Sequence, residues 1–252
     1  MTTLPPEHPM RVDPAKTGPA RIGLWVTMLG PFGIEALAGF ELDWIGIDLQ
    51  HGDIPLHALP PLVRACEAAG FPVAVRIDGH DPALIARVVD GGADAVIVPA
   101  VDSAAQAAAL VRAVRLPPAG ARSSGISRTS LGVARAASHT LLLPMIETAA
   151  GFAALDEILC VPGVDGVFVG PYDLSLSLGT DGVADPRTIE AARKVVDSAR
   201  GRGLVSGIYS GNADITSRFG DVSLLALGSD VDALRHGLGE LLESAPGVPP
   251  AG

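Results

Sequence analysis

Short apolar runs rich in Val, Ile and Leu alternate along the chain, from residue 21 on, with Ala-rich segments of helical length. Continuous apolar runs of this length are typical of strands buried on both faces of a parallel sheet. The predicted strands are Arg21–Thr27, Trp44–Leu49, Pro72–Ile77, Ala95–Pro99, Thr140–Glu147, Gly166–Val169, Leu204–Tyr209 and Val222–Leu227. The predicted helices are Ile34–Phe40, Leu56–Ala69, Pro82–Gly91, Ser103–Val114, Ala149–Leu159, Pro186–Arg200, Ala213–Phe219 and Val231–Glu243.

This alternation predicts an α/β protein with a closed (β/α)8 TIM barrel. The rival is an open, doubly wound sheet, which typically carries a glycine-rich phosphate loop after its first strand. The segment from Met28 to Gly33 lacks that spacing. We therefore predict one barrel domain over residues 21–245, an arm outside it over residues 1–20 and a flexible tail over residues 246–252. The longest interruption, Arg115–His139, is expected to add short helices at one rim.

Composition and charge narrow the possible functions. The 252 residues fit one (β/α)8 core, and a hydrophobic fraction of 48% excludes disorder for most of the chain. A net charge of −10 gives no general attraction to nucleic acid or to anionic membranes. The chain has no apolar run of membrane-spanning length and no signal-peptide pattern at its start, so we expect a cytoplasmic protein. Cys66 and Cys160 lie in apolar helical patterns and are expected to be buried thiols.

Two acidic residues follow neighbouring predicted strands. The carboxyl ends of barrel strands form the face where catalytic groups gather. Glu147 ends the fifth strand and Asp173 follows the sixth, without histidine or cysteine companions at metal-ligand spacing. Oxygen-only ligation suits a hard divalent cation such as Mg²⁺ or Mn²⁺. The alternative is that each carboxylate caps the following helix or pairs with an arginine.

A histidine and an arginine stand at the ends of the second and third predicted strands. His51 is a candidate general base, and Arg76 is a candidate for holding an oxyanion or a carboxylate. The alternative is that His51 bonds a loop and Arg76 neutralises Asp48. The other histidines are expected at the surface or at helix caps; they are His8, His57, His80, His139 and His236.

Lysine is nearly absent from the chain, which bears on the type of carbon–carbon chemistry available. Lys16 lies in the predicted arm and Lys194 in the sixth predicted helix, so no strand lysine could form a Schiff base with a ketone. A metal ion acting on a carbonyl oxygen is the remaining electron sink. The absence of lysine therefore supports the metal interpretation of Glu147 and Asp173.

A basic stretch and two aromatic residues complete the candidate features. The stretch contains Arg112, Arg115, Arg122, Arg128 and Arg135. It could attract an anionic substrate, contact another subunit or form a solvated face. Trp25 and Tyr172 lie near the predicted rim, where they would line a pocket, although core packing explains Trp25 equally well.

Four segments stand out by their order and spacing: Asp43–Gly52 (DWIGIDLQHG), Pro117–Arg122 (PPAGAR), Met145–Thr148 (MIET) and Gly163–Ser175 (GVDGVFVGPYDLS). Together they resemble the HpcH/HpaI aldolase/citrate lyase family. Within that family they are most similar to the metal-dependent class II pyruvate aldolases that act on 4-hydroxy-2-oxoheptanedioate or 2-dehydro-3-deoxyglucarate. The resemblance runs from about residue 21 to about residue 240.

The resemblance implies a phosphoenolpyruvate/pyruvate-type barrel in which Glu147 and Asp173 hold Mg²⁺ or Mn²⁺, with Co²⁺ as a further option. The cation would bind the keto and carboxylate oxygens of pyruvate or a similar 2-oxo acid. Backbone amides at Tyr172 and Asp173 would receive the substrate carboxylate, and Arg76 would steady the reacting oxygens. The residues expected to line the substrate site are Trp25, Arg76, Gly170, Pro171, Tyr172, Asp173 and Leu227.

The resemblance also implies an oligomer. His51 would transfer protons, paired with an aspartate from a neighbouring subunit, and Asp90 occupies the matching place in this chain. Asp90 lies near the end of an outer helix, far from its own barrel mouth, so it could act only on a neighbour. The expected assembly is a homohexamer, a trimer of dimers, with the C-terminal helix exchanged between partners. From the sequence alone, Asp90 is simply an exposed helix residue.

The implied activity is the reversible cleavage of 4-hydroxy-2-oxo acids into pyruvate, or a pyruvate-like 2-oxo acid, and an aldehyde. An acyl-CoA lyase of the citrate lyase β-subunit or malyl-CoA type is the first alternative, and a non-catalytic barrel that binds 2-oxo acids is the second. Two residues depart from the family pattern: Gln50 stands where glutamate is frequent, and Met145 where glutamine is frequent. Both lie beside the expected ligands and bear on substrate preference.

Overall fold

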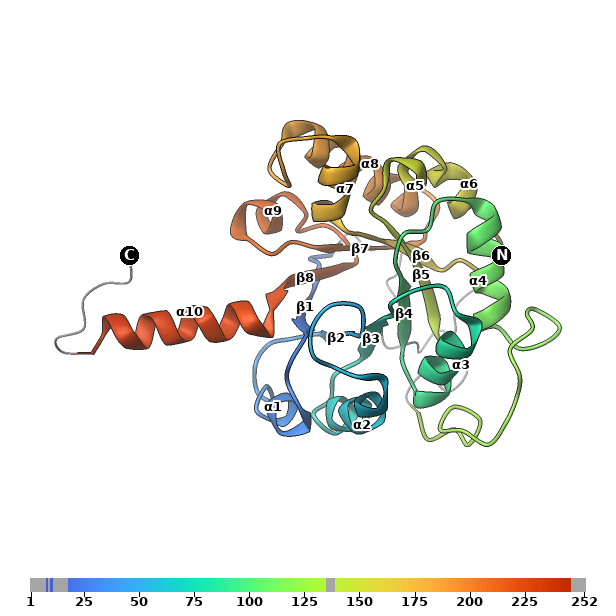
Figure 1. Cartoon of the computed structure of the whole chain (residues 1–252), viewed down its shortest axis with the longest axis horizontal. Helices are drawn as coiled ribbons and strands as arrows, with labels where there is room; N and C mark the ends of the chain where they lie inside the picture. Colours follow the sequence, from blue (N-terminus) through green and yellow to red (C-terminus); the bar gives the residue numbers. More distant parts are fainter. Residues whose placement is uncertain (1–7, 9, 11–17, 135–138, 246–252) are drawn as a thin grey trace.

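Eight parallel strands close into one barrel, as predicted. The structure is a computed structural model, and it describes residue 8, residue 10 and residues 18–134 and 139–245. The strands are β1 (Arg21–Val26), β2 (Trp44–Asp48), β3 (Val73–Arg76), β4 (Ala95–Val98), β5 (Leu141–Ile146), β6 (Gly166–Val169), β7 (Val205–Tyr209) and β8 (Leu224–Ser229). Each strand pairs with its sequence neighbours, and β1 pairs with β8 to complete the ring (Figure 1).

Helices surround this ring and connect successive strands (Figure 1). They are α1 (Pro31–Glu35), the 3-10 helix η1 (Leu56–Ala58), α2 (Leu59–Ala68), α3 (Pro82–Gly91), α4 (Ala104–Val114), α5 (Ala149–Ala153), α6 (Leu155–Leu159), α7 (Pro171–Leu178), α8 (Pro186–Arg200), α9 (Ala213–Arg218) and α10 (Asp230–Glu243). The α10 helix extends away from the barrel, at the left of Figure 1. No helix among residues 18–134 and 139–245 has both the length and the apolar composition needed to cross a membrane.

Several helices differ from the prediction. The α7 helix is additional: its apolar and polar residues nearly alternate, which hides the helical period, although Pro171 starts it and the left-handed Gly179 ends it. The predicted helix over 149–159 divides into α5 and α6, and the first helix is shorter and begins earlier than predicted. Residues 115–134 contain turns instead of the short helices expected there.

Two separate apolar cores stabilise the barrel. The larger lies between the strands and the helices and contains most of the buried Val, Ile and Leu residues. The smaller lies inside the barrel and includes three aromatic rings. Glycines make room for these rings: a Cβ atom at Gly23 would lie 2.2 Å from Trp44, and one at Gly207 would lie 2.3 Å from Phe168. Strand residues alternate between the two cores, because successive side chains point to opposite faces of a strand.

Residues ahead of β1 close the interior core. Met10 is fully buried and packs with Trp44 and other interior residues, so an arm outside the barrel is the wrong description for it. His8 is also buried, with its Nδ1 atom accepting the Met10 N–H at 3.1 Å and its ring edge-on to His139. His139 in turn bonds Asp165 at 2.9 Å. The prediction that these two histidines lie at the surface or at caps is therefore wrong.

Three arginines of the basic stretch form ion pairs within the chain, whereas Arg112 is exposed. The acidic partners of the three come from distant parts of the sequence: Arg115 pairs with Asp165, Arg122 with Asp90 and Arg128 with Glu67. These three arginine side chains are 9–22% exposed, so they do not form a solvated face. Arg135 lies outside the described residues. Of the two cysteines, Cys66 is buried as predicted, whereas Cys160 is exposed at the end of α6.

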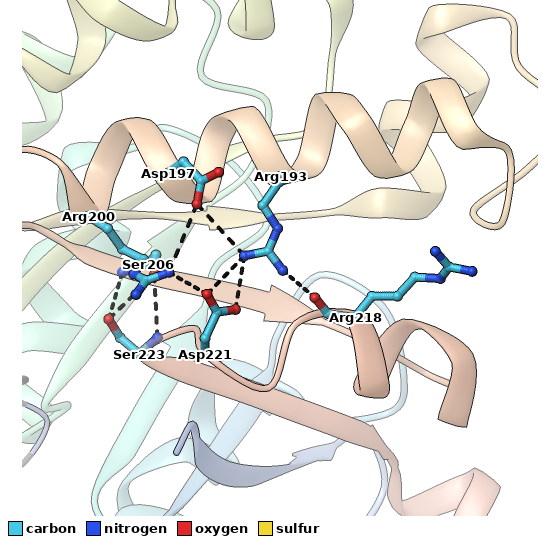
Figure 2. A network of polar contacts seen from close by, with 7 residues as sticks. All are labelled: Arg193, Asp197, Arg200, Ser206, Arg218, Asp221 and Ser223. Carbon is cyan, nitrogen blue, oxygen red and sulfur yellow. Dashed lines mark hydrogen bonds and ion pairs between the residues drawn. The ribbon is translucent and has the colours of Figure 1, made fainter. Parts of the chain in front are cut away.

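A second set of ion pairs joins α8 to the segment before β8 (Figure 2). Arg193 contacts Asp221 at 2.9 Å and also donates to the carbonyl of Arg218, while Arg200 contacts the other Asp221 oxygen. The Ser206 and Ser223 side chains link β7 to the residue before β8. Exposed pairs of this kind each contribute about 1 kcal/mol or less to the free energy of unfolding. Their main effect is therefore to orient α8 against the segment before β8.

The buried carboxylate of Asp230 joins the loop after β1 to the helix that follows β8. Asp230, the first residue of α10, is 4% exposed. One oxygen accepts the amide and the hydroxyl of Thr27, at 3.0 and 2.7 Å, and the other accepts the amides of Met28 and Leu29, both at 2.9 Å. The loop after β1 is thereby tied to the base of α10.

We predict that Asp230→Ala lowers the free energy of unfolding by about 2–4 kcal/mol, because it leaves three part-buried N–H groups without this acceptor. Urea denaturation at one fixed protein concentration measures this loss. The matched control is Asp214→Ala, which removes an exposed acid from α9 and should cost about 0.5 kcal/mol or less. Equal losses in the two variants would contradict the role of Asp230.

We also predict that His8 makes the fold sensitive to acid. Burial and, to a smaller extent, the neighbouring His139 lower the pKa of His8 from 6.5 to about 4. Between these pH values the unfolded chain binds more protons than the folded chain, so stability falls as the pH falls from 6.5 to 4, by about 2–3 kcal/mol. In urea denaturation, His8→Gln should show a smaller loss over this range than wild type. The exposed His57→Gln should behave like wild type, and a loss in His8→Gln as large as in wild type would refute the assignment.

Candidate active site

Polar side chains gather where β2, β3, β5 and β6 end. Asp48 and Arg76 are the last residues of β2 and β3 and lie opposite one another in the strand register. Glu147 follows β5, and Gly170 follows β6, its neighbour in the barrel. Parallel strands deliver these ends to one face of the barrel. The structure thus places Asp48, Arg76 and Glu147 at the carboxyl ends of their strands, on one face of the barrel.

Asp48 organises one half of the cluster. Its side chain is 1% exposed and receives two bonds from Arg76, from Nε to Oδ1 at 2.9 Å and from Nη2 to Oδ2 at 2.5 Å. The Trp25 ring N–H donates to Oδ2 at 3.2 Å. The amides of Gln50 and His51 donate to Oδ1, at 3.0 and 3.3 Å. Asp48 therefore fixes an arginine, an aromatic ring and the start of the loop that carries His51.

Arg76 is held in one orientation but keeps donors for another ligand. A guanidinium group has five N–H bonds, and the bidentate pair with Asp48 uses two of them. Its central carbon lies 5.3 Å from the centre of the Trp25 ring, which adds a cation–π contact. The arginine does neutralise Asp48, as the alternative interpretation proposed. That role does not exclude a second one, because the side chain is 12% exposed.

Glu147 is a buried carboxylate with little compensation. It is 6% exposed, and its Oε1 atom accepts the N–H of Ala100 at 2.8 Å. Burial raises the pKa of Glu147 above its usual value; the bond from Ala100 opposes this rise and the nearby Asp173 carboxylate adds to it. Arg76 is close enough to lower it slightly. A cation beside Glu147 and Asp173 would relieve both the burial and the repulsion.

Glu147 lies directly against the start of α7. A Cβ atom at Gly170 would lie 2.6 Å from Oε2 and 3.0 Å from the Cβ atom of Glu147, so a larger residue there would displace this carboxylate. The α7 helix starts at the next residue with the buried Pro171, and the exposed Asp173 lies in its first turn. The first helical amide bond of α7 is made by Leu174, so the amides of Tyr172 and Asp173 point out of the helix end. Such an end favours an anionic ligand.

The remaining predicted residues lie at different distances from this cluster. His51 has an exposed side chain on the loop after β2. Tyr172 is 66% exposed, and Leu227, on β8, is 40% exposed. Asp90 is at the far end of α3, where Arg122 bonds one of its oxygens at 2.6 Å. The structure therefore does not bring Asp90 to the cluster of its own chain.

Three features of the site have no signal in the sequence. Ala100, which donates to Glu147, has a left-handed backbone with φ of 49°. His80 bonds the carbonyl of Pro99 at 2.7 Å, which is a role beyond capping. Tyr209 packs against Trp25 and donates to Asp232 at 3.3 Å. Burial, together with Asp232, raises the pKa of Tyr209 to about 12, so it remains a hydrogen-bond donor.

The ligands available to a metal are few. The described part of the chain contains no group of three or more His, Cys, Asp or Glu side chains that could hold a metal ion. Glu147 and Asp173 together offer two carboxylates and leave several coordination positions to substrate and water. This donor set fits a hard divalent cation, which often keeps such positions open.

Comparisons with known proteins agree with this geometry. The family model described as HpcH/HpaI aldolase/citrate lyase matches residues 21–237. The hydroxypyruvate/pyruvate aldolase of Pseudomonas aeruginosa is 38% identical over 94% of this chain and 92% of its own length. The 4-hydroxy-2-oxo-heptane-1,7-dioate aldolase of Klebsiella pneumoniae is 34% identical over 89% of each chain.

A solved structure shows the same barrel. The crystal structure of an HpcH/HpaI aldolase/citrate lyase family protein from Burkholderia cenocepacia J2315 has a TM-score of 0.83 and 27% identity, covering 94% of this chain and 97% of that one. The family match spans most of the chain, and the aldolase relatives exceed 30% identity over nearly their whole length. The chain thus belongs to the HpcH/HpaI aldolase/citrate lyase family, as its motifs and its barrel predict.

Proposed function

We propose that the protein is a metal-dependent class II aldolase that reversibly cleaves 4-hydroxy-2-oxo acids into a 2-oxo acid and an aldehyde. The 2-oxo acid is pyruvate or a pyruvate-like compound. The observation that carries this proposal is the approach of Glu147 to Gly170 and the α7 end, across the barrel mouth from the Asp48-bound Arg76. The names of the aldolase relatives support the same reaction class.

Glu147 and Asp173 would hold the cation, with Mg²⁺ or Mn²⁺ as the expected ion and Co²⁺ as a further option. When bound, the cation supplies Lewis-acid polarisation of the substrate's keto oxygen, which makes the bond next to it easier to break. The chain has no strand lysine that could do this through a Schiff base. A cation there would offset the burial of Glu147 and its repulsion by Asp173, which together raise the pKa of Glu147.

The other residues would hold and orient the substrate. The amides of Tyr172 and Asp173, presented by the Gly170-Pro171 start of α7, would receive the substrate carboxylate. Arg76 would donate to the oxygen that gains charge as the carbon–carbon bond breaks. Because Asp48 and the Trp25 ring already fix the guanidinium, little reorganisation is needed during the reaction. Trp25 and Leu227 would border the aldehyde side.

His51 would move the proton, with help from a neighbouring subunit. Its side chain is exposed in a single chain, whereas its backbone is anchored to Asp48. Asp90 is half-buried beside a groove of about 170 Å³, lined also by Arg122, Ser130 and His139. Arg122 holds one Asp90 oxygen and orients the carboxylate. We propose that this groove receives the His51 loop of another subunit, so that each active site is completed by two chains.

The α10 helix supports an oligomer as well. It carries Val231, Leu234, Leu238, Leu241 and Leu242, which are 36–69% exposed. Four of them recur at three- and four-residue spacing and form one apolar stripe along a helix that extends from the barrel (Figure 1). A stripe of this kind is typical of a surface that a partner covers. We propose that α10 is exchanged between subunits of a homohexamer arranged as a trimer of dimers.

The acyl-CoA lyase alternative has less support. It would use the basic stretch to hold the CoA phosphates, but Arg115, Arg122 and Arg128 are paired within the chain. The aldolase names of the relatives also favour the first proposal. A purely binding role would not require Arg76 to keep unused donors opposite a pair of carboxylates.

We predict that metal removal and loss of either carboxylate abolish the aldolase reaction. Pyruvate released from a 4-hydroxy-2-oxo acid should vanish after chelation and return with Mn²⁺ or Mg²⁺. Glu147→Gln and Asp173→Asn should each lower turnover by at least about 100-fold, because losing a metal ligand should cost more than losing a residue that only hydrogen-bonds a ligand. The circular dichroism spectrum should stay unchanged. Asp156→Asn, which changes an exposed acid on α6, is the control and should remain active. Undiminished turnover in metal-free protein would refute the proposal.

We further predict that two inactive variants restore each other when they share an oligomer. His51→Ala and Asp90→Ala should each be poorly active. In co-expressed, purified mixed oligomers, a site with both groups intact should form in about one quarter of cases if each site uses two subunits. The control mixture is His51→Ala with Glu147→Ala, whose residues belong to the same site and should give no recovery. Verified mixed oligomers without recovered activity in the first pair would exclude the shared site.

A further inference from the structure

The loop after β4 passes beside Glu147 in an unusual conformation. Within the described chain, Ala100 is the one non-glycine residue with a positive φ, at 49°. Left-handed backbone is unfavourable for alanine because its Cβ atom crowds the carbonyl oxygen. Such residues persist where surrounding contacts determine the conformation, and they cluster at functional sites. The contacts around Ala100 therefore indicate which interaction requires this backbone conformation.

One peptide unit carries the contact between this loop and Glu147. The Pro99 carbonyl and the Ala100 N–H belong to the same planar, trans peptide and point in opposite directions. Oε1 of Glu147 accepts the N–H at 2.8 Å. Nε2 of His80 lies 2.7 Å from the carbonyl oxygen and serves as its donor, because a carbonyl can only accept. The peptide is thus held at both ends, by His80 on one side and by Glu147 on the other.

Further bonds hold the loop on either side of this peptide. The amide of Val101 donates to the carbonyl of Met145 at 3.3 Å. Asp102 accepts the hydroxyl of Thr148, which also caps α5. Gly151 leaves the space this requires, since a Cβ atom there would lie 2.6 Å from the carbonyl of Val101. These bonds prevent the loop from shifting as a whole. The Pro99–Ala100 peptide could still rotate, and the bond from His80 prevents this rotation.

We propose that His80 is a positioning residue that fixes the Pro99–Ala100 peptide and, through it, the orientation of the Glu147 carboxylate. Oε1 is occupied by the bond from Ala100. Oε2 faces Gly170 at the start of α7, so it is the oxygen available on the side of Asp173. This inference rests on the proposed function, because it assigns the orientation of a residue that would bind the cation. In this role His80 acts through its bond to the Pro99 carbonyl and not by contact with the cation or the substrate.

The experiment measures Mn²⁺ affinity by isothermal titration calorimetry of metal-stripped, full-length protein. His80→Ala should weaken Mn²⁺ binding by about 10-fold or more, the usual effect of losing an outer-shell hydrogen bond. His80→Gln should regain most of the affinity, because its side-chain amide can donate to the Pro99 carbonyl. His57→Ala, which removes an exposed histidine from η1, is the matched control and should leave the affinity unchanged.

A second variant separates positioning from general damage to the fold. In the absence of His80, the strain of the left-handed Ala100 would favour rotation of the peptide. Glycine adopts positive φ without strain, so Ala100→Gly removes this tendency. In the His80→Ala background, Ala100→Gly should therefore recover part of the Mn²⁺ affinity, and the two changes should be non-additive. A structural defect at His80 would instead lower the urea midpoint and would not be repaired at residue 100.

The outcomes distinguish this inference from the proposed function. If Glu147→Gln abolishes Mn²⁺ binding but His80→Ala leaves the affinity unchanged, the positioning role is overturned and the aldolase proposal stands. If Glu147→Gln itself leaves Mn²⁺ affinity unchanged, the cation does not bind at Glu147 and both fail. Weakened binding in His80→Ala, with recovery in His80→Gln, supports the inference.

Discussion

The carboxylate of Asp48, buried at the end of β2, is the constraint on which the candidate site depends. A charge that is 1% exposed is unfavourable unless hydrogen bonds and an opposite charge compensate it. The chain supplies Arg76, the Trp25 ring N–H and two loop amides. The bonds that compensate this charge therefore fix the Arg76 side chain, place the Trp25 ring at the barrel mouth and anchor the backbone at His51. Stability and preorganisation come from the same bonds.

The barrel contains two kinds of buried acid, and the difference indicates which are functional. Asp48, Asp165 and Asp230 each accept several bonds that use both oxygens. Glu147 is similarly buried, but within the described chain its bonding comes from the Ala100 amide, and its pKa is raised by burial. A saturated carboxylate organises structure and has no capacity left for a ligand. An undercompensated one gains most from a cation, which is why we propose Glu147 as a ligand of the cation.

Local patterns were sufficient to predict the barrel and the acids at its strand ends, because apolar runs and strand order are encoded by neighbouring residues. Glu147 and Asp173 come after strands and Arg76 is the last residue of one, so their positions in the sequence were enough to select them as candidates. Contacts between distant segments carry no such local signal. The stretch over 115–134 contains no acid, so its ion pairs with Asp165, Asp90 and Glu67 could be seen only in the folded chain. The left-handed Ala100 was equally hidden, since alanine gives no hint of positive φ.

Contacts in the structure show what surrounds Met145 and Gln50, the two residues expected to depart from the family pattern. Met145 lies two residues before Glu147, packs in the interior core and is 2% exposed, with its sulfur near the space left by Gly170. A thioether cannot donate a hydrogen bond to the carboxylate, as an amide at that position could. The orientation of Glu147 then depends more heavily on the Ala100 peptide and on what holds it. Gln50, whose buried side-chain oxygen has no hydrogen-bond partner among the described residues, leaves a second acceptor close to the Asp48 cluster. Met145 therefore leaves the orientation of Glu147 more dependent on the Ala100 peptide and on the ligand that completes the site.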